Sequence, residues 1–229
     1  MKARLILIAT LVIFMIPAVC LAEPIRTGGY MSAFVGATAP NDTTVTTDDF
    51  ITNKTSRDRI ELDPGVNIGM SGGYDFGYLR MEGELSYKHS EISDIVDQSD
   101  SFHFRNVDGN TAALAVMFNS FVDLHNDSIV TPYFGGGAGF ATLYISDTFG
   151  TDTRGGAVNR KKLYEFDFDS VFAYQVGGGV EIAVNRVLSL DLGYRYFGTT
   201  TAKFNKDLDL TNKFRLESHN AAVGFRFKF

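Results

Sequence analysis

Hydrophobic and polar residues alternate over several long stretches of this chain. In the clearest stretch, residues 164–184, the even positions are mostly aromatic or aliphatic, whereas the odd positions are acidic, small or glycine. A period of two residues places these two sets on opposite faces of a β-strand. Residues 79–88, 188–197 and 222–229 divide in the same way. The pattern therefore predicts four strands, each with one apolar face and one polar face.

Four weaker stretches bring the expected number of strands to eight. They cover residues 28–37, 60–74, 110–122 and 129–145. Short connections alternate with long polar ones along the chain. The short ones are residues 75–77, 123–128 and 185–187, and the long ones are 38–59, 89–107, 146–163 and 198–215. This order predicts an all-β fold, a single eight-stranded antiparallel up-and-down β-barrel with its four long loops at one end.

The N-terminus has the pattern of a cleavable signal peptide. Lys2 and Arg4 precede an apolar segment, residues 5–16, which Pro17 ends, and small residues follow up to Ala22. A membrane-anchoring helix would need about 20 apolar residues. We therefore expect residues 1–22 to be removed on export, leaving a barrel domain of residues 23–229. The only cysteine lies within the signal peptide, so disulfides and cysteine–metal sites are excluded from the mature chain.

Composition narrows the possible partners. The formal charge of −6 argues against nucleic acid, whose phosphates require a basic surface. The 20 Phe and 10 Tyr supply an aromatic fraction of 13%, which is typical of strands rather than of helices.

Alternation alone does not decide which face of the barrel points inward. A soluble periplasmic ligand-binding barrel buries its apolar face, whereas a transmembrane barrel turns that face towards lipid. The polar face is rich in glycine, which suits a narrow interior, and aromatic residues gather near the strand ends as in the interfacial belts of membrane barrels. We favour a transmembrane barrel in a bacterial outer membrane with its long loops outside the cell. The soluble barrel remains the alternative.

Four segments carry a resemblance to a known family. They are residues 131–139 (TPYFGGGAG), 173–180 (AYQVGGGV), 190–197 (LDLGYRYF) and 224–229 (GFRFKF). They resemble opacity-family porins and OmpA-type outer-membrane barrels. The resemblance implies a Gram-negative surface protein, with periplasmic chaperones and the barrel-assembly machinery as partners during biogenesis. Phe225, Phe227 and the terminal Phe229 look like the signal that this machinery reads.

Seven charged residues occupy the face that a membrane barrel would turn inward. They are Arg80, Glu82, Glu84, Glu181, Asp191, Arg195 and Arg226. An eight-stranded barrel has an interior that side chains just fill, so we expect opposite charges to pair and plug it. The expected pairs are Arg195 with Glu84, and Arg80 and Arg226 with Glu82, Glu181 or Asp191. The alternative is a small diffusion pore lined by these charges.

Catalysis has little support in the sequence. Ser218 and His219 are adjacent and therefore point to opposite faces of a strand, so their proximity does not indicate a catalytic pair. Metal-binding and cofactor-binding motifs are missing from the sequence as well, and we expect neither a metal nor a cofactor. The sequence thus predicts a protein that is not an enzyme, with a lipid-modifying barrel enzyme as the alternative.

The third long loop is basic. Arg154, Arg160, Lys161 and Lys162 could contact lipopolysaccharide phosphates beside the barrel rim, although acidic neighbours dilute their charge. The alternation of residues 164–184 also exceeds the 9 to 11 residues that cross a bilayer, so we expect Glu165, Asp167 and Asp169 to lie beyond the membrane. The sequence predicts a monomeric outer-membrane protein with a structural or surface-recognition role and does not identify an external ligand.

Overall fold

The computed structural model describes residues 27–49, 54–98, 102–126, 128–152, 159–204 and 210–229. The expected signal peptide, residues 1–22, lies outside these ranges. Within them, no helix is long and apolar enough to cross a membrane.

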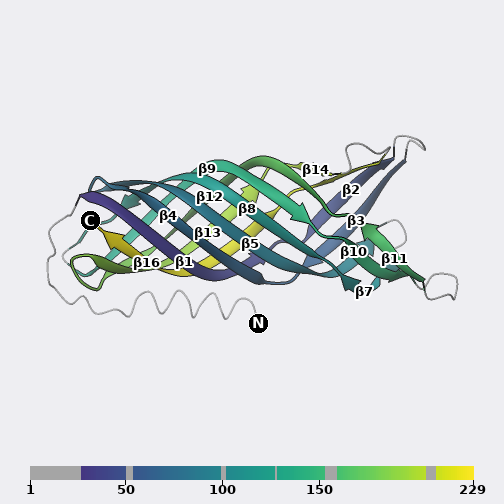
Figure 1. Cartoon of the computed structure of the whole chain (residues 1–229), viewed down its shortest axis with the longest axis horizontal. Coiled ribbons are helices and arrows are strands. Elements are labelled where there is room, and N and C mark those ends of the chain that lie inside the picture. Colours follow the sequence, from purple (N-terminus) through teal and green to yellow (C-terminus); the bar gives the residue numbers. More distant parts are fainter. Residues whose placement is uncertain (1–26, 50–53, 99–101, 127, 153–158, 205–209) are drawn as a thin grey trace.

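Eight long strands form a closed barrel (Figure 1). They are β1 (Gly28–Pro40), β4 (Gly65–Asp75), β5 (Leu79–Asp97), β8 (Asn110–Asp123), β9 (Val130–Ile145), β12 (Asp167–Ala183), β13 (Leu188–Thr199) and β16 (Glu217–Lys228). Each pairs antiparallel with its neighbours, and β16 returns to pair with β1 from Tyr30↔Lys228 to Pro40↔Ser218. The predicted eight-stranded antiparallel barrel is confirmed.

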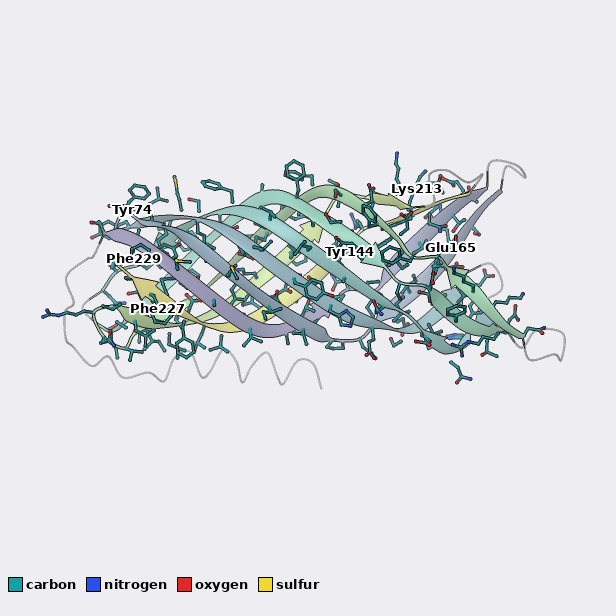
Figure 2. The ribbon with its side chains drawn as sticks, in the orientation of Figure 1. Tyr74, Tyr144, Glu165, Lys213, Phe227 and Phe229 are labelled. Carbon is teal, nitrogen blue, oxygen red and sulfur yellow. The ribbon has the colours of Figure 1, made fainter. Side chains whose placement is uncertain are left out.

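The barrel wall is apolar outside and polar inside. On β5, Leu79 is 38% exposed on the outer face, whereas the next residue, Arg80, is 0% exposed inside. On β16, Phe225 is 52% exposed and Arg226 only 3%. Figure 2 shows Tyr74, Phe227 and Phe229 at the end of the short turns and Tyr144 towards the opposite end. The apolar face therefore points outward, as a barrel embedded in lipid requires.

The long polar connections contain strands of their own, which the alternation pattern did not predict. One sheet continues the barrel through β2 (Thr43–Asp49), β3 (Lys54–Leu62), β6 (Phe102–His103), β14 (Ala202–Phe204) and β15 (Leu210–Phe214), joined to the upper part of β5. A second sheet contains β7 (Arg105–Asp108), β10 (Thr148–Asp152) and β11 (Asn159–Tyr164). We call these two sheets the extension. It projects from the end opposite the C-terminus (Figure 1).

A break at Asp63-Pro64 divides the single strand expected over residues 60–74. β3 ends at Leu62 and β4 begins at Gly65, because proline has no N–H for the ladder and redirects the chain. The break also reverses the faces. Ile60 is 2% exposed in the core of the extension, whereas Ile68, at the same parity, is 50% exposed on the outer wall.

A similar break lies at the start of the strand expected over residues 164–184, because Tyr164 ends β11 and β12 begins only at Asp167. Tyr164 is 6% exposed, whereas Phe166 is 60% exposed. The Tyr164 hydroxyl donates a 2.9 Å hydrogen bond to Asp58 Oδ2 on β3 and so joins the two sheets of the extension. Burial, together with the neighbouring carboxylates, raises the pKa of Tyr164 well above its ordinary value.

Replacing Tyr164→Phe should loosen this junction by about 1 kcal/mol, since it removes the hydrogen bond to Asp58. The folded-state pKa of Tyr164 is raised, so unfolding of the junction releases a proton above the ordinary pKa of 10.0, and stability should fall as the pH rises beyond it. Subtilisin cleavage of the extension measures both effects. The variant should be cut faster at neutral pH and show a weaker alkaline increase than the wild type. Equal rates at every pH would rule this role out.

Candidate functional site

Eight charged side chains meet inside the half of the barrel nearest the short turns. We call them the interior charge network: Arg80, Glu82, Glu84, Asp123, Glu181, Asp191, Arg195 and Arg226. Seven of them are the residues that alternation placed on the inner face. Six of the eight are buried, with Asp191 and Arg195 partly exposed.

The upper part of the network centres on Glu84. Its carboxylate pairs with Arg195 and accepts hydrogen bonds from Asn119 Nδ2 at 2.9 Å and Gln175 Nε2 at 3.0 Å. The Arg195 guanidinium also lies 3.6 Å from Glu82 Oε1. The structure thus brings Arg195 and Glu84 together as the sequence analysis expected, and adds two amides that the alternation did not single out.

The lower part centres on Glu181. Arg226 pairs with Glu181 and lies 2.8 Å from Asp191 Oδ2, while Arg80 Nη1 lies 3.8 Å from Glu181 Oε2. The shorter ion pair of Arg80 is with Asp123, at 2.9 Å. The sequence analysis missed Asp123 because it assigned residue 123 to a short turn. The inward positions 119 and 121 of the preceding strand could have indicated it, since residue 123 continues the same parity.

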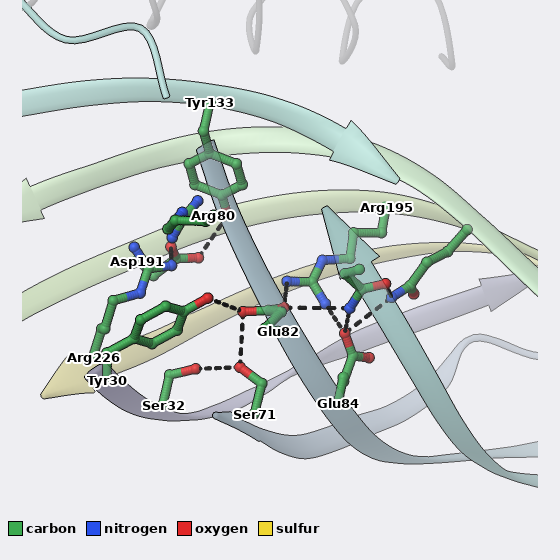
Figure 3. A network of polar contacts seen from close by, with 12 residues as sticks. Tyr30, Ser32, Ser71, Arg80, Glu82, Glu84, Tyr133, Asp191, Arg195 and Arg226 are labelled. Carbon is green, nitrogen blue, oxygen red and sulfur yellow. Dashed lines mark hydrogen bonds and ion pairs between the residues drawn. The ribbon is translucent and has the colours of Figure 1, made fainter. Parts of the chain in front are cut away.

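Neutral polar groups complete the network (Figure 3). The Tyr30 hydroxyl donates to Glu82 Oε2 at 2.8 Å, Ser71 Oγ donates to the same oxygen at 3.1 Å, and the Tyr133 hydroxyl donates to Asp191 Oδ1 at 2.7 Å. Each of these carboxylates therefore has both a cation and a hydroxyl as partners. Buried charges need such additional hydrogen bonds to offset the cost of leaving water.

Glycines on the neighbouring strands make room for some of these side chains, since Gly177 pairs with Arg195 and Gly137 pairs with Asn119. A Cβ atom at Gly177 would lie 2.8 Å from the Cα of Arg195 and 3.0 Å from its Cγ. At Gly137 it would lie 2.1 Å from Asn119 Oδ1. The glycine-rich segments of β9 and β12 are therefore required by close approach, not by backbone conformation.

Towards the extension, the interior becomes apolar on the side of β8, β9, β12 and β13. This apolar layer consists of Ala113, Ala115, Met117, Leu143, Val171, Ala173 and Phe197, each 7% exposed or less. Lys88 lies at its boundary, with Nζ 4.3 Å from the centroid of the Phe197 ring. The core continues without interruption into the extension through Ile60, Ile95, Phe204 and Phe214.

A cavity of about 30 Å³ lies between the interior charge network and Lys88. Since one water occupies roughly 10 to 15 Å³ by this measure, the cavity has room for two or three waters. Asn67 Oδ1, Asn220 Oδ1 and Thr38 Oγ1 are buried nearby without a protein hydrogen-bond partner. These acceptors suit water, and the cavity is too small for an organic substrate.

The residues weighed for catalysis do not meet. Ser218 is 1% exposed inside the barrel, whereas His219 is exposed on the outer wall, where its Nδ1 lies 2.6 Å from the Tyr194 hydroxyl. Among the described residues, no group of three or more His, Cys, Asp or Glu side chains could hold a metal ion. No catalytic constellation follows from these positions.

The basic residues of the third long connection lie on β11, and each has an acidic partner. Arg160 lies 3.3 Å from Asp108, Lys161 lies 3.0 Å from Asp152, and Lys162 lies 2.9 Å from Glu165. Arg154 lies outside the described residues. The three aromatic residues near the C-terminus, Phe225, Phe227 and Phe229, point outward with exposed fractions of 52%, 52% and 79%.

Comparison with known proteins agrees with this architecture. Residues 6–229 match the family described as "Outer membrane protein beta-barrel domain". Outer membrane protein PagN of Salmonella typhimurium is 26% identical over 148 residues, which cover 61% of this chain and 59% of that protein. The structure of OprG from Pseudomonas aeruginosa superimposes with a TM-score of 0.59 at 14% identity, covering 91% of this chain and 99% of OprG. Neisserial surface protein A gives a TM-score of 0.49 at 18% identity, with coverages of 89% and 99%.

Replacing Arg195→Leu should destabilise the barrel by about 3 to 5 kcal/mol, because it leaves Glu84 buried without its cation. The double variant Arg195→Leu/Glu84→Gln removes both charges and should recover most of that loss. The free energy of unfolding of each variant is measured by urea titration in lipid vesicles, with heat-dependent gel mobility as the readout of the folded fraction. If the single and double variants were equally unstable, the ion pair would not be the stabilising contact.

Proposed function

Since the chain belongs to the outer membrane β-barrel protein family, we propose that its barrel is a closed scaffold that holds a rigid recognition surface outside the cell. The described interior offers no catalytic arrangement, and its cavity of about 30 Å³ holds only water-sized molecules. The largest built feature apart from the barrel is the extension. The proposal therefore assigns the stability to the barrel and the recognition to the extension.

The single observation that carries the closed interior is its packing in two successive zones. The interior charge network fills the half near the short turns with paired ions, and the apolar layer follows it. Phe197 and Leu143 are 0% and 1% exposed, so little solvent reaches this level. A hydrated ion would have to separate buried ion pairs and then pass between the apolar layer on one side and buried polar side chains such as Ser86 and Lys88 on the other. Both steps are costly.

The extension supports recognition because it is ordered by specific contacts. Tyr164 joins its two sheets through Asp58, and Lys213 Nζ lies 2.7 Å from Asp48 Oδ2 between β15 and β2. Paired strands present side chains at fixed positions, which lowers the entropy lost when a partner binds. The polar outer surface is therefore better suited to binding than a set of irregular loops.

Two further assignments remain proposals. Phe225, Phe227 and Phe229 present an aromatic face near the C-terminus that the barrel-assembly machinery could bind. Arg160, Lys161 and Lys162 could reach lipopolysaccharide phosphates, but a phosphate would first have to displace their carboxylate partners. That competition makes phosphate binding at these three residues of β11 less favourable.

Single-channel recording in planar bilayers tests the closed interior. The wild-type barrel should show no discrete conductance steps. The variant Phe197→Ser/Leu143→Ser makes the apolar layer polar and should admit water and brief openings, whereas the outer-wall control Phe225→Ser should stay silent. Stable steps in the wild type would contradict the closed barrel and favour the diffusion pore.

Removal of the extension tests the recognition role. A variant whose four long connections are replaced by short turns keeps the eight barrel strands, so it should still insert and show heat-dependent gel mobility. Bacteria that display this variant should lose any adhesion to epithelial cells that the full chain confers. Wild-type adhesion that survives trimming would place the binding surface elsewhere.

A further inference from the structure

Above the paired strands β1 and β16, the strand pairing is interrupted between residues 41–46 and residues 213–217. Asn41 N donates to Glu217 O at 2.8 Å, and pairing resumes only at Thr46↔Lys213. Between these points, a 3.0 Å hydrogen bond from Thr43 Oγ1 to Arg215 O crosses the gap. We call this opening the seam pocket.

Both edges of the seam pocket are hydrogen-bonded to neighbouring strands on the side away from the gap. Thr43 pairs with Ile60 on β3, and Phe214 pairs with Ala202 on β14. Thr199 N donates to Leu216 O at 2.9 Å. The parting is therefore part of the fold and not a frayed end, and it leaves two strand edges facing each other across a gap.

The gap has the volume and the chemistry of a small polar site. Its volume is about 500 Å³, and four threonine side chains, Asn41 and the Asp42 and Glu217 carboxylates line it together with Lys213 and Arg215. This combination supplies hydrogen-bond donors and acceptors on both sides. A pocket of this size is within the range that holds a small organic ligand.

The charges of the pocket cancel. Arg215 Nη2 lies 3.1 Å from Glu217, and Arg59 Nη2, behind Asp42, lies 2.5 Å from the Asp42 carboxylate. Lys213 is held by Asp48 at 2.7 Å. A phosphate would have to compete with three carboxylates for these cations. Neutral hydroxyl groups do not face that competition, since each can donate to a carboxylate and accept from a cation or a threonine.

The outward residues of β16 fix the height of the pocket relative to the membrane. They run from Phe229, Phe227, Phe225, Val223 and Ala221 to His219, Glu217 and then Arg215. Phe229 to His219 is 11 residues, which is the length that crosses the hydrocarbon. At a tilt of about 45°, the four residues from His219 to Arg215 rise roughly 9 Å further. The seam pocket therefore lies at the level of the outer-leaflet headgroups.

We propose that the seam pocket binds a sugar ring of an outer-leaflet glycolipid whose acyl chains lie against the apolar wall below it. Val223 and Phe225 on β16 and Val35 on β1 form that wall further down the same two strands, with exposed fractions of 41%, 52% and 53%. The sugar hydroxyls bind the threonines and the paired ions. This inference depends on the outer-membrane location and is independent of whether the barrel interior is closed.

Native mass spectrometry of the full chain in phosphatidylcholine nanodiscs tests the proposal, with lipopolysaccharide truncated to its inner core as the probe. Thr44→Trp fills the pocket and Arg215→Gln removes one donor group, and each should weaken retention of the glycolipid about tenfold. Ser93→Trp and Arg160→Gln make comparable changes on the extension outside the pocket and should bind as the wild type does. Heat-dependent gel mobility shows that each variant is folded.

Several results would overturn the proposal. The wild type could fail to retain the glycolipid, or both pocket variants could retain it at wild-type strength. A loss in Arg160→Gln with none in Arg215→Gln would move the site to β11. The released core oligosaccharide tests the source of the sugar, because competition as strong as that of the intact glycolipid would mean that the acyl chains contribute nothing and that the ligand is a soluble glycan.

Discussion

The structure depends on the lack of water in the hydrocarbon, where every backbone N–H and C=O must find a partner in the protein. The chain meets this constraint by closing eight strands into a ring, with β16 paired to β1 over eleven residue pairs. Once the ring is closed, side chains must alternate between lipid and the interior. Leu79 outside and Arg80 inside are a direct consequence, because a buried cation next to a lipid-facing leucine is stable only if the interior supplies its counter-charges.

The interior charge network follows from the small bore of an eight-stranded ring. Glycines on β9 and β12 leave room for side chains of the strands paired with them, such as Asn119 on β8 and Arg195 on β13. Because the bore is so narrow, Arg195 meets Glu84 on the opposite wall, and Arg226 meets Glu181 two strands away, inside the barrel instead of remaining hydrated. The same narrowness lets Phe197 and its neighbours pack against one another as a buried cluster.

The strands of the extension also alternate apolar and polar residues, but their apolar face points inward instead of outward. Within the membrane, the apolar face of each strand points outward to lipid, whereas beyond it the apolar face must turn inward, away from water. The two-residue break at Asp63-Pro64 makes this reversal, so Ile60 enters the core while Ile68 faces lipid. The result is an ordered sheet that carries the threonines and paired ions of the seam pocket beyond the barrel strands β1 and β16.

The sequence by itself determined the eight strands, their antiparallel order and the placement of seven charges on the polar face of those strands, because a period of two residues is a local property of a strand. It also predicted that Arg195 and Glu84 would meet. It did not predict Asp123 as the partner of Arg80, nor the strands within the long connections, since both depend on which segments pair across the barrel. Only the tertiary structure decided that the apolar face points outward and that the seam between β2 and β15 parts. Alternation is identical for an inverted barrel, and a seam exists only where residues more than 160 positions apart in the sequence come together.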